Sequence, residues 1–232
     1  MKIKTIFLFL SVIFSLVINA QEYQLKETFD FYRNNKMVSG EWSSGTLTEK
    51  DIEGSPYLTD DFINGTIYTV QKQKYVDIPV RYNIYNDQME FKTESGEVQA
   101  MATPEIVERV EFGKYKMAYI PFSYSKKLIK GFFIILQEGE KASLFLRKNM
   151  SFKNAEEPAP YKEAQPPRFV KNPDDYFIRI GMEEAKAVNS KKDLLEIFPD
   201  YKKDVESFIK KNKTKTNAPE SLEELIKYYN SL

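Results

Sequence analysis

The sequence predicts an α+β protein in which an antiparallel β meander, curved into a sandwich or a partial barrel, is followed by a small C-terminal helical bundle. Between residues 66 and 147, short runs rich in tyrosine, phenylalanine and β-branched residues recur, and turn residues separate them. Several of these runs alternate apolar and polar residues, which is the period of a strand with one buried face. From residue 190 onward the apolar residues recur at helical spacing instead.

The first 20 residues predict a cleavable secretory signal peptide. Lys2 and Lys4 form a short basic region, and an apolar stretch from Ile6 to Ile18 follows it. This stretch has about 13 residues, whereas a membrane-spanning helix needs about 20, so we favour cleavage after Ala20 over a retained anchor. We therefore expect an exported protein, periplasmic or extracellular, that is not an integral membrane protein after cleavage.

Four segments follow from this pattern. They are a signal peptide at 1–20, a β-rich domain at 21–153, a Pro-rich loop or linker at 154–168, and a segment at 169–232 with a short strand and helices that pack on the sheet.

The strongest strand signal is a hairpin. Ile78–Tyr85 alternates, Asn86-Asp87 supplies a turn, and Gln88–Thr93 returns. Further strands are expected at Thr66–Val70, Val107–Phe112, Tyr115–Pro121, Gly131–Leu136, Ser143–Arg147 and Tyr176–Ile180.

Three short helices are expected at the C-terminal end. Ser190 and Asp193 start the first, and Pro199-Asp200 ends it and caps the second. The third opens with a capping box formed by Ser221 and Glu224.

Two absences exclude several chemistries. The chain contains no cysteine and no histidine, which excludes disulfides, thiol nucleophiles, Ser-His-Asp triads and the usual zinc ligands. We expect no metal and no cofactor. Lysine and arginine total 34, as do aspartate and glutamate, so there is no basic excess that would indicate a nucleic-acid partner.

The most distinctive candidate for binding lies in the predicted hairpin. Arg81 and Asn83 share one strand face, where they are placed to contact a polar ligand or a partner strand. The alternative is that Arg81 pairs with a carboxylate such as Glu90 across the hairpin.

Two further candidates precede it in the chain. The loop that carries Tyr57, Asp60 and Asp61 offers paired acids beside a tyrosine, which suits a cation or a sugar. We favour the alternative, a turn or helix start capped by Thr59 or Asp60. Trp42 either stacks on a ligand or anchors the start of the domain by packing.

Three stretches resemble a known family. They are Gly54–Leu58 with Asp61-Phe62, the run RYNIYNDQME from Arg81 to Glu90, and Lys192–Leu195 with Phe208–Asn212. Together they are similar to an uncharacterised family of exported proteins common in Bacteroidetes, and the resemblance covers most of the mature chain. That family has no assigned activity, so it implies export and no site residues.

These observations favour a non-enzymatic module that binds another component of the cell envelope. The alternatives are a carboxylate-dependent hydrolase acting on glycans and a carrier of an apolar ligand. The hydrolase requires two facing acids, and the carrier requires a hydrophobic cavity between sheet and helices. The sequence leaves the partner and the oligomeric state open.

Overall fold

The structure is a computed structural model that describes residues 52–125, 127–158, 160 and 163–232. These residues belong to one compact unit, which spans 37–232. The predicted signal peptide and Trp42 lie outside the described residues, so both stay predictions.

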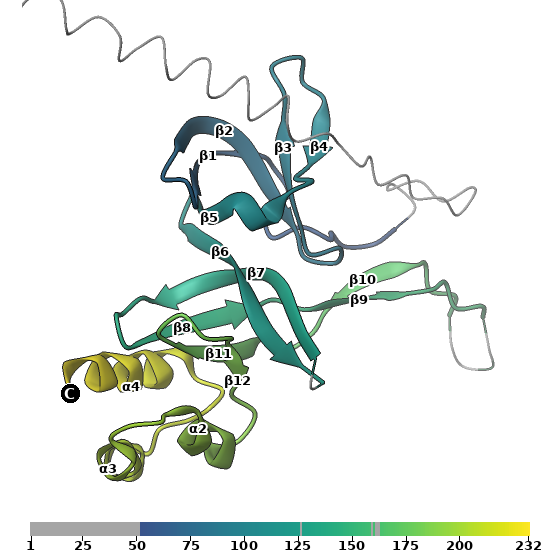
Figure 1. The fold of residues 1–232 in the computed structure, drawn as a ribbon. Helices are drawn as coiled ribbons and strands as arrows, with labels where there is room; N and C mark the ends of the chain where they lie inside the picture. Colours follow the sequence, from purple (N-terminus) through teal and green to yellow (C-terminus); the bar gives the residue numbers. More distant parts are fainter. Residues whose placement is uncertain (1–51, 126, 159, 161–162) are drawn as a thin grey trace, which may run out of the picture. The chain divides into compact units, whose positions relative to one another are not determined.

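The described chain forms an antiparallel ten-stranded sheet, curled into a half-barrel, followed by three helices (Figure 1). The strand order is β12-β11-β8-β7-β6-β5-β1-β2-β3-β4. The strands are β1 (Ile63–Thr69), β2 (Lys74–Asn83), β3 (Gln88–Lys92), β4 (Val98–Ala100), β5 (Val107–Phe112), β6 (Tyr115–Tyr124), β7 (Lys127–Gln137), β8 (Ala142–Arg147), β11 (Asp175–Ile180) and β12 (Lys186–Ala187). This confirms the predicted fold class, in its partial-barrel form.

The predicted hairpin and the six other predicted strands are all present, within a few residues of the predicted bounds. The strands β4 and β12 were not predicted. A separate two-stranded ribbon, β9 (Met150–Lys153) with β10 (Arg168–Lys171), flanks the Pro-rich segment. A short 3₁₀ turn, η3 (Pro104–Ile106), precedes β5.

Irregular pairing accompanies the curl of the sheet. The registers of β1 with β2, β1 with β5, and β7 with β8 each shift once, and such bulges increase local twist. At Gly65, in β1, a Cβ atom would lie 2.6 Å from the Glu111 carbonyl oxygen and 2.9 Å from the Phe112 Cβ. Only glycine allows the two neighbouring strands to approach β1 this closely.

The helices are α2 (Lys191–Ile197), α3 (Lys202–Asn212) and α4 (Pro219–Ser231), and they pack against one face of β8 and β11. The Asn230 side chain fixes α4 to β8: its Nδ2 donates to the Ala142 carbonyl at 2.8 Å, and its Oδ1 accepts from the backbone N–H of Lys141 and Ala142. The buried side chains of this interface are Ala142, Leu144, Ile178, Val188, Leu194, Ile197, Phe198, Val205, Ile209, Leu222, Leu225, Ile226 and Tyr229.

One of the three predicted caps is confirmed. The Ser190 hydroxyl accepts from the Asp193 N–H at 3.1 Å, as expected for the start of α2. The other two caps are wrong. Tyr201, in the left-handed conformation, precedes α3, and α4 begins at Pro219 with Ala218 before it. Because a proline suits the first helical position, the helix starts before Ser221.

The opposite face of β6, β7, β8 and β11 encloses a second core. Phe122, Phe133 and Phe177 pack edge to face with ring centroids 5.0–5.6 Å apart. The segment before β12 then returns to β6: the Ala185 N–H donates to the Pro121 carbonyl, and the Ala185 carbonyl accepts from the Ser123 N–H. This contact leaves β6 with a neighbour on each side near its end.

Candidate functional site

The structure brings most of the sequence-predicted residues together around Arg81. We call Tyr57, Phe62, Arg81, Asn83 and Glu90 the Arg81 cluster. The guanidinium carbon lies 3.4 Å from the ring centroid of Tyr57 and 4.4 Å from that of Phe62. Its Nη2 donates to Glu90 Oε2 at 2.8 Å, and the Asn83 Nδ2 lies 3.5 Å from Glu90 Oε1. Two aromatic rings and one carboxylate thus surround the guanidinium.

The Arg81 cluster is nearly closed to solvent. The side chains of Arg81 and Glu90 are 16% and 12% exposed, and the two residues are direct partners in the β2–β3 register. The predicted alternative, an ion pair across the hairpin, is confirmed. A binding role for Arg81 or Asn83 stays a prediction, and one that requires these contacts to open.

The paired acids lie at the rim of the Arg81 cluster. The Asp60 carbonyl accepts from Arg81 Nη1 at 3.2 Å, and the Asp61 carbonyl accepts from the Thr59 hydroxyl at 3.1 Å. Both acidic residues are exposed. Among the described residues no group of three or more acidic, histidine or cysteine side chains is placed to hold a metal ion.

A second charged cluster, which sequence reasoning missed, forms around Asp87. We call Tyr82, Asp87, Phe132 and Arg147 the Asp87 cluster. Asp87 Oδ1 accepts from the Tyr82 hydroxyl at 2.7 Å and from the Phe132 N–H at 3.1 Å, and Oδ2 accepts from Arg147 Nη2 at 2.9 Å. One turn residue therefore joins the β2–β3 hairpin to β7 and β8, which lie elsewhere in the sheet order.

Local backbone and packing place this carboxylate. Asp87 has a φ of 53°, in the left-handed region that aspartate tolerates better than most residues. A Cβ atom on Gly131 would collide with the ends of the Arg147 and Asp87 side chains, so a larger residue at 131 would displace this ion pair where it crosses β7. Burial raises the pKa of Tyr82 well above its usual value, and the Asp87 charge adds to this shift. Tyr82 therefore stays protonated and donates to the carboxylate.

An open groove adjoins the Asp87 cluster, and we call it the hairpin groove. It has a volume of about 200 Å³, and two of its lining residues stack on each other: the Arg147 guanidinium carbon lies 4.7 Å from the ring centroid of Phe122. On one wall the Asn149 Nδ2 donates to the Asp175 carboxylate at 2.7 Å. The lining residues are Phe122, Tyr124, Ile129, Arg147, Asn149, Asp175 and Phe177.

The end of the β6–β7 hairpin, which forms the other wall, is unusually apolar for an exposed element. Tyr124 is 63% exposed, Leu128 is 66% exposed and Ile129 is 41% exposed. Lys127 and Lys130 flank these side chains and are exposed as well. An exposed hairpin end that is both apolar and basic, beside an aromatic groove, is suited to contact with another molecule.

A second open pocket, of about 540 Å³, lies over β5–β8 and β11. Arg109 pairs there with Glu111 at 3.0 Å. Arg179 contacts the sulfur of Met182, and burial lowers the pKa of its guanidinium. Two arginines, Arg109 and Arg179, and three glutamates, Glu108, Glu138 and Glu140, line this pocket, so both signs of charge are present.

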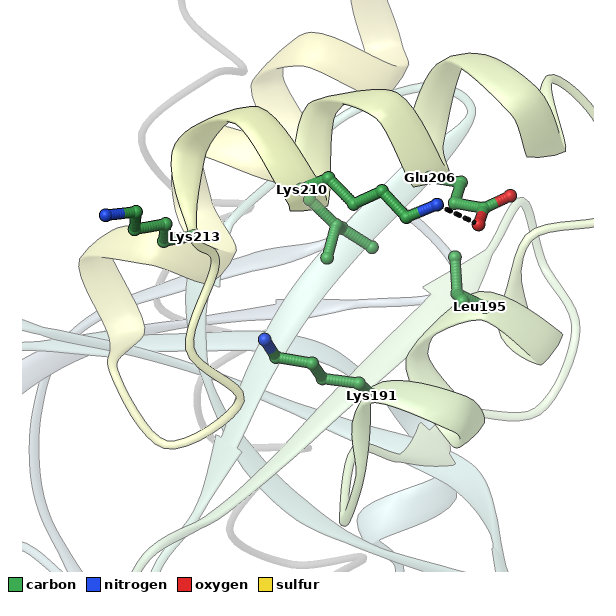
Figure 2. A pocket seen from close by; sticks show the side chains of 6 residues that line it. Lys191, Leu195, Glu206, Lys210 and Lys213 are labelled. Atoms are coloured by element: carbon green, nitrogen blue, oxygen red, sulfur yellow. Dashed lines mark hydrogen bonds and ion pairs between the residues drawn. The ribbon is translucent and has the colours of Figure 1, made fainter.

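A third pocket lies between α2 and α3 (Figure 2). Lys191, Lys210 and Lys213 line it, with Leu195 among the apolar side chains, and it measures about 400 Å³. Lys210 forms an ion pair with Glu206 at 2.7 Å. The side chains of Lys191, Lys210 and Lys213 point in different directions and do not converge on one point (Figure 2).

Comparison with known proteins gives no functional assignment: a scan against protein-family models and searches of curated proteins and of solved structures each found no match. Within the described part of the chain, no helix combines the length and the apolar character that crossing a bilayer demands.

Proposed function

We propose that this chain is an exported, non-enzymatic module that binds a protein of the cell envelope through the hairpin groove. The observation that carries this proposal is the exposed apolar end of the β6–β7 hairpin. Tyr124 and Ile129 line the aromatic groove there, and Leu128 is exposed on the other face of the same hairpin. Exposed apolar side chains that gather in one place are typical of interaction sites, and tyrosine is enriched there.

The contacts of the charged groups favour binding over hydrolysis. The carboxylates of Asp87 and Asp175, in or beside the hairpin groove, already accept hydrogen bonds, from Arg147 and from Asn149 respectively. A glycosidase instead needs one carboxyl group to protonate the leaving group while a second faces it across the bond.

Packing likewise favours an interaction module over a carrier of an apolar ligand. Leu144, Ile178, Leu222 and Leu225 fill the contact between sheet and helices, and each is fully buried. A carrier would need an apolar space at that contact, large enough to enclose most of its ligand.

The proposal is tested with a matched pair of surface variants. In one, Tyr124→Ser and Leu128→Ser remove the apolar hairpin end; in the other, Val98→Ser changes an exposed apolar residue of β4 that is 43% exposed. Each tagged protein is crosslinked in intact cells, purified and compared with the wild type by quantitative mass spectrometry.

We expect a partner that is abundant with the wild type and with Val98→Ser and is reduced about tenfold with the double variant. Equal recovery with all three proteins, or no partner with any, would contradict the proposal.

A further inference from the structure

The hairpin groove is bordered by a strand edge that no other described strand occupies. On one side, β7 pairs with β6 continuously from Lys127 to Ile134. On the other side it pairs with β8 only from Ile134 onward, because β8 ends at Arg147 and the chain turns away into β9. Between Lys127 and Phe133, this second edge of β7 has no strand partner among the described residues.

The direction of the backbone groups on this edge follows from the register. The Phe132 N–H donates to Asp87 and so points away from β6. In an antiparallel pair the direction of the N–H and C=O groups alternates from residue to residue. Leu128 and Lys130 have the same parity as Phe132, so their N–H and C=O groups also point to the open edge.

The pairing on β6 gives the same result independently. Pro121 and Ser123 are the register partners of Lys130 and Leu128. The Pro121 carbonyl accepts from the Ala185 N–H, and the Ser123 N–H donates to the Ala185 carbonyl, on the side of β6 away from β7. At these two register positions β6 and β7 therefore make no backbone hydrogen bonds to each other. The N–H and C=O groups of Leu128 and Lys130 accordingly point away from β6, to the open edge of β7.

Leu128 and Lys130 thus present two donors and two acceptors in the spacing of a strand. Within the described part of the chain no hydrogen bond uses these four groups. An extended peptide can add to such an edge, with main-chain hydrogen bonds supplying affinity and alternate side chains supplying specificity.

We propose that an extended, acidic segment of a partner protein adds as a strand to β7 at Leu128–Lys130, an inference that rests on the proposed binding function. Its charge follows from the edge: Lys127 and Lys130 are exposed there, and the sequence from Ser123 to Gln137 contains three lysines, at 126, 127 and 130, and no acid. Alternate side chains would enter the hairpin groove, where Phe122 and Phe177 favour apolar groups.

A second copy of this chain fits the edge poorly. If two β7 edges paired antiparallel around Ile129, Lys130 of each copy would face Leu128 of the other. The two Lys130 side chains would then be diagonal neighbours on one face of the pair, where like charges are unfavourable. Lysines on an edge strand also discourage unspecific pairing. The same lysines attract an acidic strand, so the charge selects among partners.

The test uses a synthetic probe and the full chain labelled with ¹⁵N. The probe is a seven-residue peptide with blocked ends in which glutamate and valine alternate, and its control replaces each glutamate with lysine. We expect the glutamate peptide to shift the amide signals of Leu128 and Lys130 and to slow their hydrogen exchange about tenfold. The lysine peptide should leave both unchanged.

Two variants at one position separate the backbone from the charge. Lys130→Pro and Lys130→Gln both remove the lysine charge, but only proline also removes the outward N–H, at a site where that N–H makes no bond to β6. We expect glutamine to weaken peptide binding a few-fold and proline to weaken it at least about tenfold further. Retention of the other amide signals verifies the fold of each variant.

Strand addition is overturned if the glutamate peptide fails to bind at millimolar concentration, if it binds without protecting Leu128 and Lys130, or if the two variants bind it equally. If any of these results occurs while the Tyr124→Ser and Leu128→Ser variant still loses its cellular partner, binding through the hairpin groove stands and only the strand mechanism fails. If that loss is absent as well, both proposals fall.

Discussion

Arg81 and Arg147 have the same immediate surroundings and different positions in the molecule. Each guanidinium lies over two aromatic rings, and each donates to a carboxylate, at 2.8 Å for Arg81 and 2.9 Å for Arg147. The carboxylate partner of Arg81 is nine residues away in sequence, whereas that of Arg147 is 60 residues away. The first pair stays within one hairpin, and the second joins distant strands of the sheet.

The distinctive motif around Arg81 therefore serves the structure of the hairpin. The surface that is open for binding is formed instead by residues that belong to no recognisable sequence motif. The Arg81 cluster is closed by Tyr57 and Phe62 and stabilises the hairpin register. Arg147 is held by Asp87 and lines the open hairpin groove.

The largest effect is expected where one side chain serves several partners. Asp87→Ala leaves the Tyr82 hydroxyl and the Phe132 N–H without their acceptor and Arg147 without its charge partner. We expect a loss of about 2–4 kcal/mol in the free energy of unfolding, measured with urea.

Two controls separate the carboxylate from the backbone. Asp87→Asn keeps an acceptor and tolerates the left-handed backbone, so a loss of only about 1 kcal/mol is expected. Asp87→Gly removes the side chain without strain and should still cost about 2 kcal/mol. Equal stability of the alanine and asparagine variants would show that the Asp87 cluster does not join the two parts of the sheet energetically.

A smaller effect is expected at the Arg81 cluster. Arg81→Met keeps the apolar stem but removes the charge, which leaves the Glu90 carboxylate unpaired, and we expect a loss of about 1–2 kcal/mol. A double-mutant cycle with Glu90→Gln should give a coupling of about 1 kcal/mol. Because this cluster lies away from the β7 edge, Arg81→Met should not change binding of the glutamate peptide, and a tenfold change would contradict that separation.

Tyr82 adds a dependence on pH. The pKa of Tyr82 is raised in the folded state. Its contribution to the free energy of unfolding is therefore complete below about pH 10, the pKa of tyrosine in an unfolded chain, where both states are protonated. Above that value only the unfolded state ionises, so stability falls as pH rises toward the folded pKa. We expect Tyr82→Phe to lose about 1 kcal/mol at pH 8 and to show a shallower decline between pH 8 and 11 than the wild type, by urea unfolding. Parallel declines would contradict the raised pKa.

The smallest effect on stability is expected at the hairpin end. Leu128 is 66% exposed, so Leu128→Ser should change the free energy of unfolding by less than about 0.5 kcal/mol while weakening binding. Leu225→Ala, in the fully buried helix–sheet interface, should instead cost about 2–5 kcal/mol and leave binding intact. A strongly destabilised Leu128→Ser protein would show that the hairpin end is part of the core.

Local sequence patterns predicted the elements that are determined by interactions between residues close in sequence. The alternation in Ile78–Tyr85 predicted β2, and the same hairpin register predicted the contact between Arg81 and Glu90. The side chain of Ser190 predicted the start of α2, because its capping bond spans only three residues.

Other features depend on contacts that no local pattern records. Asp87 was predicted only as part of a turn, since its partners Phe132 and Arg147 are distant in sequence. The strands β4 and β12 are three and two residues long, too short to show a period. The open edge of β7 arises because β8 ends early, which depends on strand pairing rather than on the composition of β7.

The most direct test of the account compares the two arginine regions in living cells. A photocrosslinking amino acid replaces Leu128, at the end of the β6–β7 hairpin, or Asp61, an exposed residue beside the Arg81 cluster. We predict that illumination joins the Leu128 probe to one defined protein and leaves the Asp61 probe uncoupled. Crosslinking to the same protein from Asp61 alone would contradict the account, because the Arg81 cluster would then be the binding surface.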